Sequence, residues 1–98
     1  MIITYLDSLI GKVYKILPLR EDAGYGDMES FYKYVEGLSV ELIGAYKTFD
    51  ELKNYAEYIA IVNIVQFLTE NPIPIYKCKT QVFKMINLIE KLKENFED

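Results

Sequence analysis

Apolar residues recur at spacings of three and four along four segments of this 98-residue chain. That spacing is the period of one face of an α-helix. The first segment, residues 3–17, carries Ile3, Leu6, Ile10, Val13 and Leu17. Because Pro18 disfavours helical geometry in the residue before it, we expect this helix to end at Leu17. The polar, glycine-bearing stretch 19–27 then reads as the longest loop in the chain.

The second and third helices follow from apolar spacing and capping signals. Phe31, Val35, Leu38 and Leu42 define a helix over 28–46, for which Asp27 is a suitable N-cap. Thr48 and Glu51 form a capping-box pattern that predicts a third helix over 49–69. The stretch 59–68 is rich in β-branched residues and could also form a buried strand, but a run of about twenty residues favours a helix.

The last segment, residues 75–96, has the most regular pattern. Its apolar positions form a heptad seam of Ile75, Cys78, Val82, Met85, Ile89, Leu92 and Phe96. Ile86 and Leu88 widen this stripe, so the helix is expected to pack between two neighbours. With short connections between successive helices, the sequence predicts an all-α, antiparallel four-helix bundle that forms a single domain over residues 1–98.

Composition suggests a surface that meets a partner. Apolar residues make up 51% of the chain, and glycine raises this to about 56%, against roughly 45–50% in ordinary globular proteins. A small protein tends to expose such a surplus, and exposed apolar patches mark interaction sites. We therefore predict a homodimer with the heptad seam as interface, because helix 3–17 is shorter than the seam. Helices 28–46 and 49–69 are long enough to cover it within one chain, which is the open alternative.

Charge argues against nucleic acid as a partner. The net charge is −4, and residues 20–70 alone contain ten acidic against four basic residues. Binding to phosphates needs clustered lysine and arginine, so nucleic-acid binding is not expected. Lys77, Lys84 and Lys91 recur every seven residues, a spacing that a solvated helix face explains better than a phosphate-binding stripe.

Candidate catalytic chemistry is sparse. The chain has no histidine, which removes the commonest general base and metal ligand. Cys78 is the single cysteine; its place in the seam favours a core role over activation by Lys77 and Lys79. The acidic loop residues Glu21, Asp22, Asp27 and Glu29 do not follow a calcium-loop spacing. We expect no catalytic residue, cofactor or metal site.

Tyrosine is unusually frequent, and its rigid body with a polar tip suits protein interfaces. The equal alternative places these rings at the boundary of the core. The nine positions are Tyr5, Tyr14, Tyr25, Tyr32, Tyr34, Tyr46, Tyr55, Tyr58 and Tyr76.

Together these features predict a small, non-catalytic protein-protein interaction module. Small size and apparent AT-rich coding favour an accessory protein of a bacteriophage or mobile element. The lone cysteine and the lack of a leader pattern favour the cytoplasm, and the apolar run 58–68 is too short to span a membrane. Two alternatives stay open: an acidic inhibitor that occupies a nucleic-acid-binding site of an enzyme, and a small enzyme that uses carboxylates and a metal.

Overall fold

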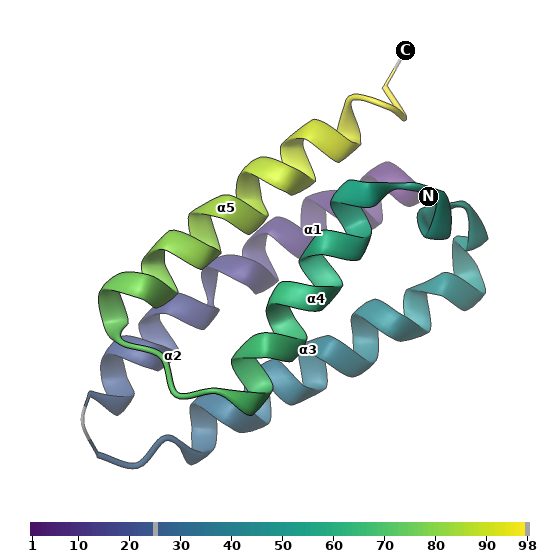
Figure 1. The fold of residues 1–98 in the computed structure, drawn as a ribbon. Helices are drawn as coiled ribbons and strands as arrows, with labels where there is room; N and C mark the ends of the chain where they lie inside the picture. Colours follow the sequence, from purple (N-terminus) through teal and green to yellow (C-terminus); the bar gives the residue numbers. More distant parts are fainter. Residues whose placement is uncertain (25, 98) are drawn as a thin grey trace.

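Each of the four amphipathic segments folds into a helical arm in the computed structural model, which describes residues 1–24 and 26–97. The arms run antiparallel as a bundle about 45 Å long (Figure 1). This confirms the predicted all-α four-helix bundle. The elements of the described residues are α1 (Ile2–Tyr14), α2 (Ile16–Ala23), α3 (Glu29–Thr48), the 3-10 helix η1 (Asp50–Asn54), α4 (Ala56–Glu70) and α5 (Ile75–Lys93).

The first arm is bent, and the predicted end at Leu17 is wrong. Pro18 is the third residue of α2, a position in the first helical turn where a missing backbone N–H is tolerated. It cannot bond to the carbonyl of Tyr14, so the helix changes direction at Lys15 and then continues as α2. Gly24, at φ 54°, ends α2 in a backbone conformation that favours glycine. The predicted loop 19–27 is therefore mostly helix.

Arg20 explains why this extra helical stretch is held in place. Its side chain is buried, and Nε donates a hydrogen bond to the carbonyl oxygen of Ile73 at 2.7 Å. Nη1 donates to the carbonyl oxygen of Gly24 at 2.8 Å. One side chain thus joins the end of α2 to the connection between α4 and α5.

The starts of the next two arms differ in how well the sequence predicted them. Met28, not the predicted Asp27, is the N-cap of α3, but Asp27 Oδ1 still accepts a hydrogen bond at 2.8 Å from the backbone N–H of Glu29, the first residue of the helix. The helix predicted to begin at residue 49 is wrong at that end, because Thr48 closes α3 and α4 begins only at Ala56. The residues between form η1, which turns Leu52 fully into the core.

The apolar stripes of the arms meet in one hydrophobic cluster. Residues 59–68 lie within α4 and supply much of it, so the strand alternative for this stretch is excluded. Around the bundle, α1 packs on α5, α5 on α4, and α4 on α3, while α2 contacts both α3 and α5. Of the four neighbouring pairs, α1 and α3 are in the least close contact, and the first arm packs on α3 mainly through α2.

The arm order places the beginning of α1 and the end of α5 at the same end of the bundle (Figure 1). An ion pair joins them there, with Lys93 Nζ 2.5 Å from Asp7 Oδ1. Within residues 1–24 and 26–97, every helix falls short of the length or the apolar character that a membrane span requires.

Candidate functional site

The heptad seam lies inside the single chain. Its residues pack toward the common core between α1 and α4, the neighbours of α5. Cys78, Val82, Met85, Ile89 and Leu92 are fully buried, and Ile75 and Phe96 are half-buried. The ring of Phe96 packs against that of Tyr55 in a tilted arrangement, with ring centroids 5.1 Å apart. The seam is therefore covered by the chain's own helices, which is the alternative that the sequence left open, and it is not a free surface of the folded chain.

Cys78 is held as a neutral thiol by its place in this seam. Burial raises the pKa of Cys78 from near 9 to about 11, although the positive charge of Arg20 opposes the change. Lys77 and Lys79 are exposed. A protonated thiol is a poor nucleophile and metal ligand, so the chemistry of Cys78 fits a small core side chain.

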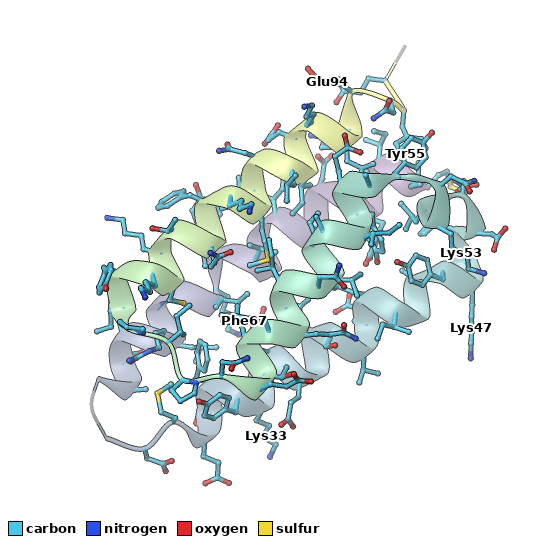
Figure 2. All side chains as sticks on the ribbon, viewed as in Figure 1. Lys33, Lys47, Lys53, Tyr55, Phe67 and Glu94 are labelled. Atoms are coloured by element: carbon cyan, nitrogen blue, oxygen red, sulfur yellow. The ribbon has the colours of Figure 1, made fainter. Side chains whose placement is uncertain are left out.

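The side of α5 that faces away from the core presents large apolar side chains to solvent. Tyr76 is 67% exposed and Phe83 is 40% exposed, and Phe67 at the end of α4 is 51% exposed. Figure 2 shows Phe67 on the surface of α4, toward the connection that leads into α5. The ring of Phe83 meets Tyr14 of α1 edge-on at 6.0 Å, which extends the aromatic surface onto the neighbouring helix.

Two shallow hollows join these side chains into one surface, which we call the α5 outer face. One hollow, of about 630 Å³, follows α5 itself, and the other, of about 390 Å³, lies against the α4–α5 connection; Tyr76 and Thr80 line both. The α5 outer face consists of Phe67, Pro72, Pro74, Tyr76, Lys77, Lys79, Thr80, Phe83, Lys84, Asn87, Leu88 and Lys91.

Charge on the α5 outer face is of one sign. Four lysines line the two hollows, and neither lining includes a carboxylate. An aromatic surface bordered by cations suits a partner that offers both apolar and acidic side chains. The basic line of Lys77, Lys84 and Lys91 predicted from the sequence is part of this surface.

Sequence reasoning missed Phe67 and Phe83. A signal for Phe83 was present, because Tyr76, Thr80, Phe83 and Asn87 follow helical spacings of four, three and four opposite the heptad seam. That stripe alternates aromatic with polar residues. A search for continuous apolar periodicity therefore passes over it.

Most of the described tyrosines stabilise the bundle, as the core-boundary alternative predicted. Tyr58 is fully buried, five more are half-buried, and Tyr14 and Tyr76 are exposed. Tyr25 lies outside the described residues. The half-buried tyrosines are Tyr5, Tyr32, Tyr34, Tyr46 and Tyr55.

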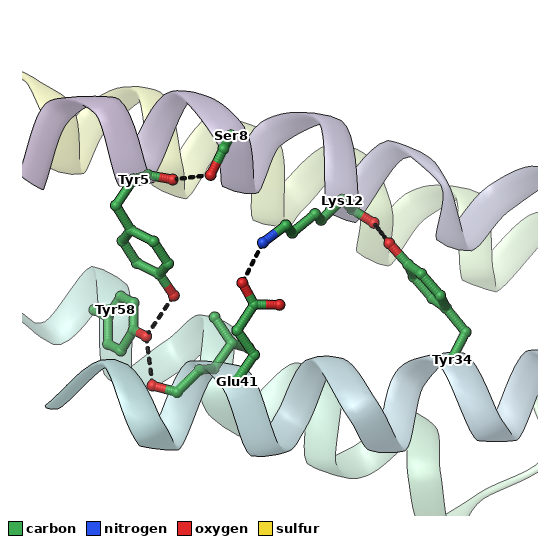
Figure 3. Close-up of polar contacts among 7 residues, drawn as sticks. Tyr5, Ser8, Lys12, Tyr34, Glu41 and Tyr58 are labelled. Atoms are coloured by element: carbon green, nitrogen blue, oxygen red, sulfur yellow. Dashed lines mark hydrogen bonds and ion pairs between the residues drawn. The ribbon is translucent and has the colours of Figure 1, made fainter. Parts of the chain in front are cut away.

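Polar side chains bridge α1 and α3 where these helices pack least (Figure 3). Tyr58 of α4 donates its hydroxyl hydrogen to the carbonyl oxygen of Leu42 at 2.5 Å. Since that hydrogen is used, the hydroxyl of Tyr5 is the donor in the 3.1 Å bond between Tyr5 and Tyr58. Burial raises the pKa of both hydroxyls, which keeps them protonated as donors.

Two further contacts cross from α1 to α3. Tyr34 donates its hydroxyl hydrogen to the carbonyl oxygen of Lys12 at 2.7 Å, and the Lys12 ammonium pairs with Glu41 (Figure 3). Both partners of the ion pair are partly exposed, so its contribution to stability is small, about 1 kcal/mol or less. These contacts position the two helices without closing the space between them.

Metal-ligating side chains do not gather in the part of the chain that the structure describes: no three Cys, Asp or Glu side chains lie close enough to hold an ion. The acidic residues Glu21, Asp22, Asp27 and Glu29 are all exposed.

The chain matches no known family model, and no curated protein or solved structure is significantly similar to it.

Proposed function

We propose that this protein is a non-catalytic interaction module that binds an acidic protein partner through the α5 outer face. The observation that carries the proposal is the exposure of Phe67, Tyr76 and Phe83 beside four lysines. Interface centres are enriched in aromatic side chains, which supply contact area at a low cost in conformational entropy. The lysines steer an acidic partner to the surface and set its orientation.

A second copy of this chain fits the α5 outer face poorly. In a two-fold dimer the same patch meets itself, so the four lysines of one chain would oppose those of the other. The heptad seam is buried and does not offer another apolar surface of that length. We therefore favour a heteromeric complex with an acidic protein over the homodimer predicted from the sequence.

Affinity capture with matched variants tests this function. Phe67→Ser and Tyr76→Ser remove aromatic contacts from exposed positions, so the fold is retained while capture of the partner falls by about tenfold or more. Val40→Ser is the control, because Val40 is 72% exposed on α3, outside the α5 outer face. Each captured protein is identified by mass spectrometry and ranked by its dependence on Tyr76.

The charge of the partner gives a second readout. The double variant Lys79→Glu and Lys84→Glu is expected to abolish capture, and high salt is expected to weaken it for the unmodified protein. A partner that binds the Tyr76 and Val40 variants equally well would contradict the proposed surface. A partner that binds equally at low and high salt would contradict its acidic character.

A further inference from the structure

A second site lies between α1 and α3, on a different side of the bundle from the α5 outer face. These helices leave a groove of about 540 Å³, which is within the range of small-molecule sites. We call it the α1–α3 groove. It is lined by Ser8, Gly11, Lys12, Lys15, Lys33, Tyr34, Gly37, Leu38 and Glu41.

We propose that the α1–α3 groove binds a small molecule that carries a carboxylate or phosphate group on an apolar body. Three lysines line the groove from both helices, whereas Glu41 is its single carboxylate and is already paired with Lys12. The groove therefore has an excess of positive charge within a chain whose net charge is −4. An anionic ligand group would offset this excess.

Lys15 and Lys33 mark the position of the anionic group. Neither forms a salt bridge with any residue in the described ranges, so both ammonium groups are available to a ligand. Lys15 Nζ lies 5.6 Å from the centre of the Tyr34 ring. A second hollow of about 280 Å³ shares Lys15, Lys33 and Tyr34 with the α1–α3 groove, so these residues stand where the two spaces meet.

Space for the apolar body comes from two glycines on facing helices. A Cβ atom added at Gly11 or at Gly37 would meet no heavy atom within 4 Å apart from the adjacent backbone of its own helix. The half-buried ring of Tyr34 provides apolar surface within the groove, and Leu38, which is buried, also lines it. Because none of the strongly exposed aromatic or aliphatic side chains among residues 1–24 and 26–97 lines it, the groove suits a small ligand better than a protein partner.

Binding of three matched probes tests the proposal: naphthoate, naphthyl phosphate and the uncharged naphthalenemethanol. Backbone amide shifts of the isotope-labelled protein report where each probe binds. At least one anionic probe is expected to give saturable shifts within 8–15 and 33–41, and naphthalenemethanol is expected to bind about tenfold more weakly. Comparison of the affinities for naphthoate and naphthyl phosphate shows whether the natural class of ligand is a carboxylic acid or a phosphate ester.

Variants of the lysines separate this site from general attraction of anions. Lys15→Glu or Lys33→Glu is expected to weaken the anionic probe about tenfold. Lys47→Glu is the control, because Lys47 is an exposed lysine of the same helix α3 that lines neither hollow and lies far along the helix from Lys33 (Figure 2). Gly37→Leu places a side chain where an added Cβ atom meets open space, and it is expected to prevent binding in a folded protein.

Several outcomes would overturn the proposal. Equal affinity for the charged and uncharged probes would show that binding does not require an anionic group. Backbone amide shifts centred on the lysines of α5 would show that the probes bind on α5 and not in the α1–α3 groove. An effect of Lys47→Glu as large as that of Lys33→Glu, or the lack of saturable binding by either anion, would also refute it. The outcome does not depend on the partner proposed for the α5 outer face.

Discussion

At the scale of single residues, Cys78 links pH to stability. Its folded pKa of about 11 lies above its ordinary value near 9. The contribution of the neutral thiol is therefore fully present below pH 9 and is lost as the pH rises toward 11. A difference of this size corresponds to about 2.7 kcal/mol once the thiol is ionised in both states, and about 2 kcal/mol of it is lost by pH 11. We predict that the free energy of unfolding falls by about this amount more in the unmodified protein than in Cys78→Ala between pH 8 and pH 11.

Urea unfolding of both proteins at the two pH values measures this difference. The variant provides the control for Tyr5 and Tyr58, whose pKa values are also raised and which weaken both proteins at high pH. Parallel pH profiles would show that the thiol is not desolvated in the folded chain. Rapid labelling of the native thiol would give the same conclusion.

Single residues also show what a sequence pattern does not resolve. The apolar spacing around Met85 and Ile89 is the same whether neighbouring helices of one chain or a second chain cover it. The heptad seam therefore predicted burial correctly but did not specify the covering surface. Phe67 and Tyr76 lie in α4 and α5, on either side of the connection between these helices. The surface that they form with nearby prolines and lysines depends on how the two helices pack, which the spacing of residues along the chain does not specify.

At the scale of elements, η1 is a structural part of the core even though it is short. Leu52 is fully buried, whereas its neighbour Glu51 is exposed. We predict that Leu52→Ala lowers the free energy of unfolding by about 3 kcal/mol, because it removes buried apolar contacts and leaves a cavity. Thermal or urea unfolding measures the loss.

Glu51→Ala is the matched control for this element and is expected to change stability by less than about 0.5 kcal/mol. If both variants had equally small effects, η1 would be a peripheral connection. The predicted capping box assigned Glu51 a role at a helix start that the structure does not show. A small effect of Glu51→Ala would agree with the structure on this point.

The four arms could be predicted from the sequence because each one keeps a continuous apolar stripe. Their joints could not, since local signals there have more than one structural outcome. Pro18 is compatible with the end of one helix or with the first turn of the next. The packing of the buried Arg20 favours the first turn of α2. Thr48 likewise matched a helix start, but burial of Leu52 favours a 3-10 turn after it.

At the scale of the whole molecule, the arrangement of surfaces predicts the oligomeric state. Because the heptad seam is internal and every charged side chain of the α5 outer face is a lysine, the isolated protein is expected to be a monomer. Sedimentation at micromolar concentration should give a mass near 11.5 kDa, the mass of one chain. Twice that mass would restore the homodimer predicted from the sequence and would require a self-complementary surface other than the heptad seam.

The four sides of the bundle are not held together in the same way. Three of its four lateral contacts, α1 with α5, α5 with α4 and α4 with α3, are direct helix packing. The fourth depends on hydrogen bonds and one ion pair, which change length at little cost compared with interlocked apolar side chains. We therefore expect the easiest breathing mode of the bundle to be the one that widens and narrows the space between α1 and α3. A molecule bound between α1 and α3 would restrict this motion. Ligand binding and the rigidity of the whole bundle would then be linked.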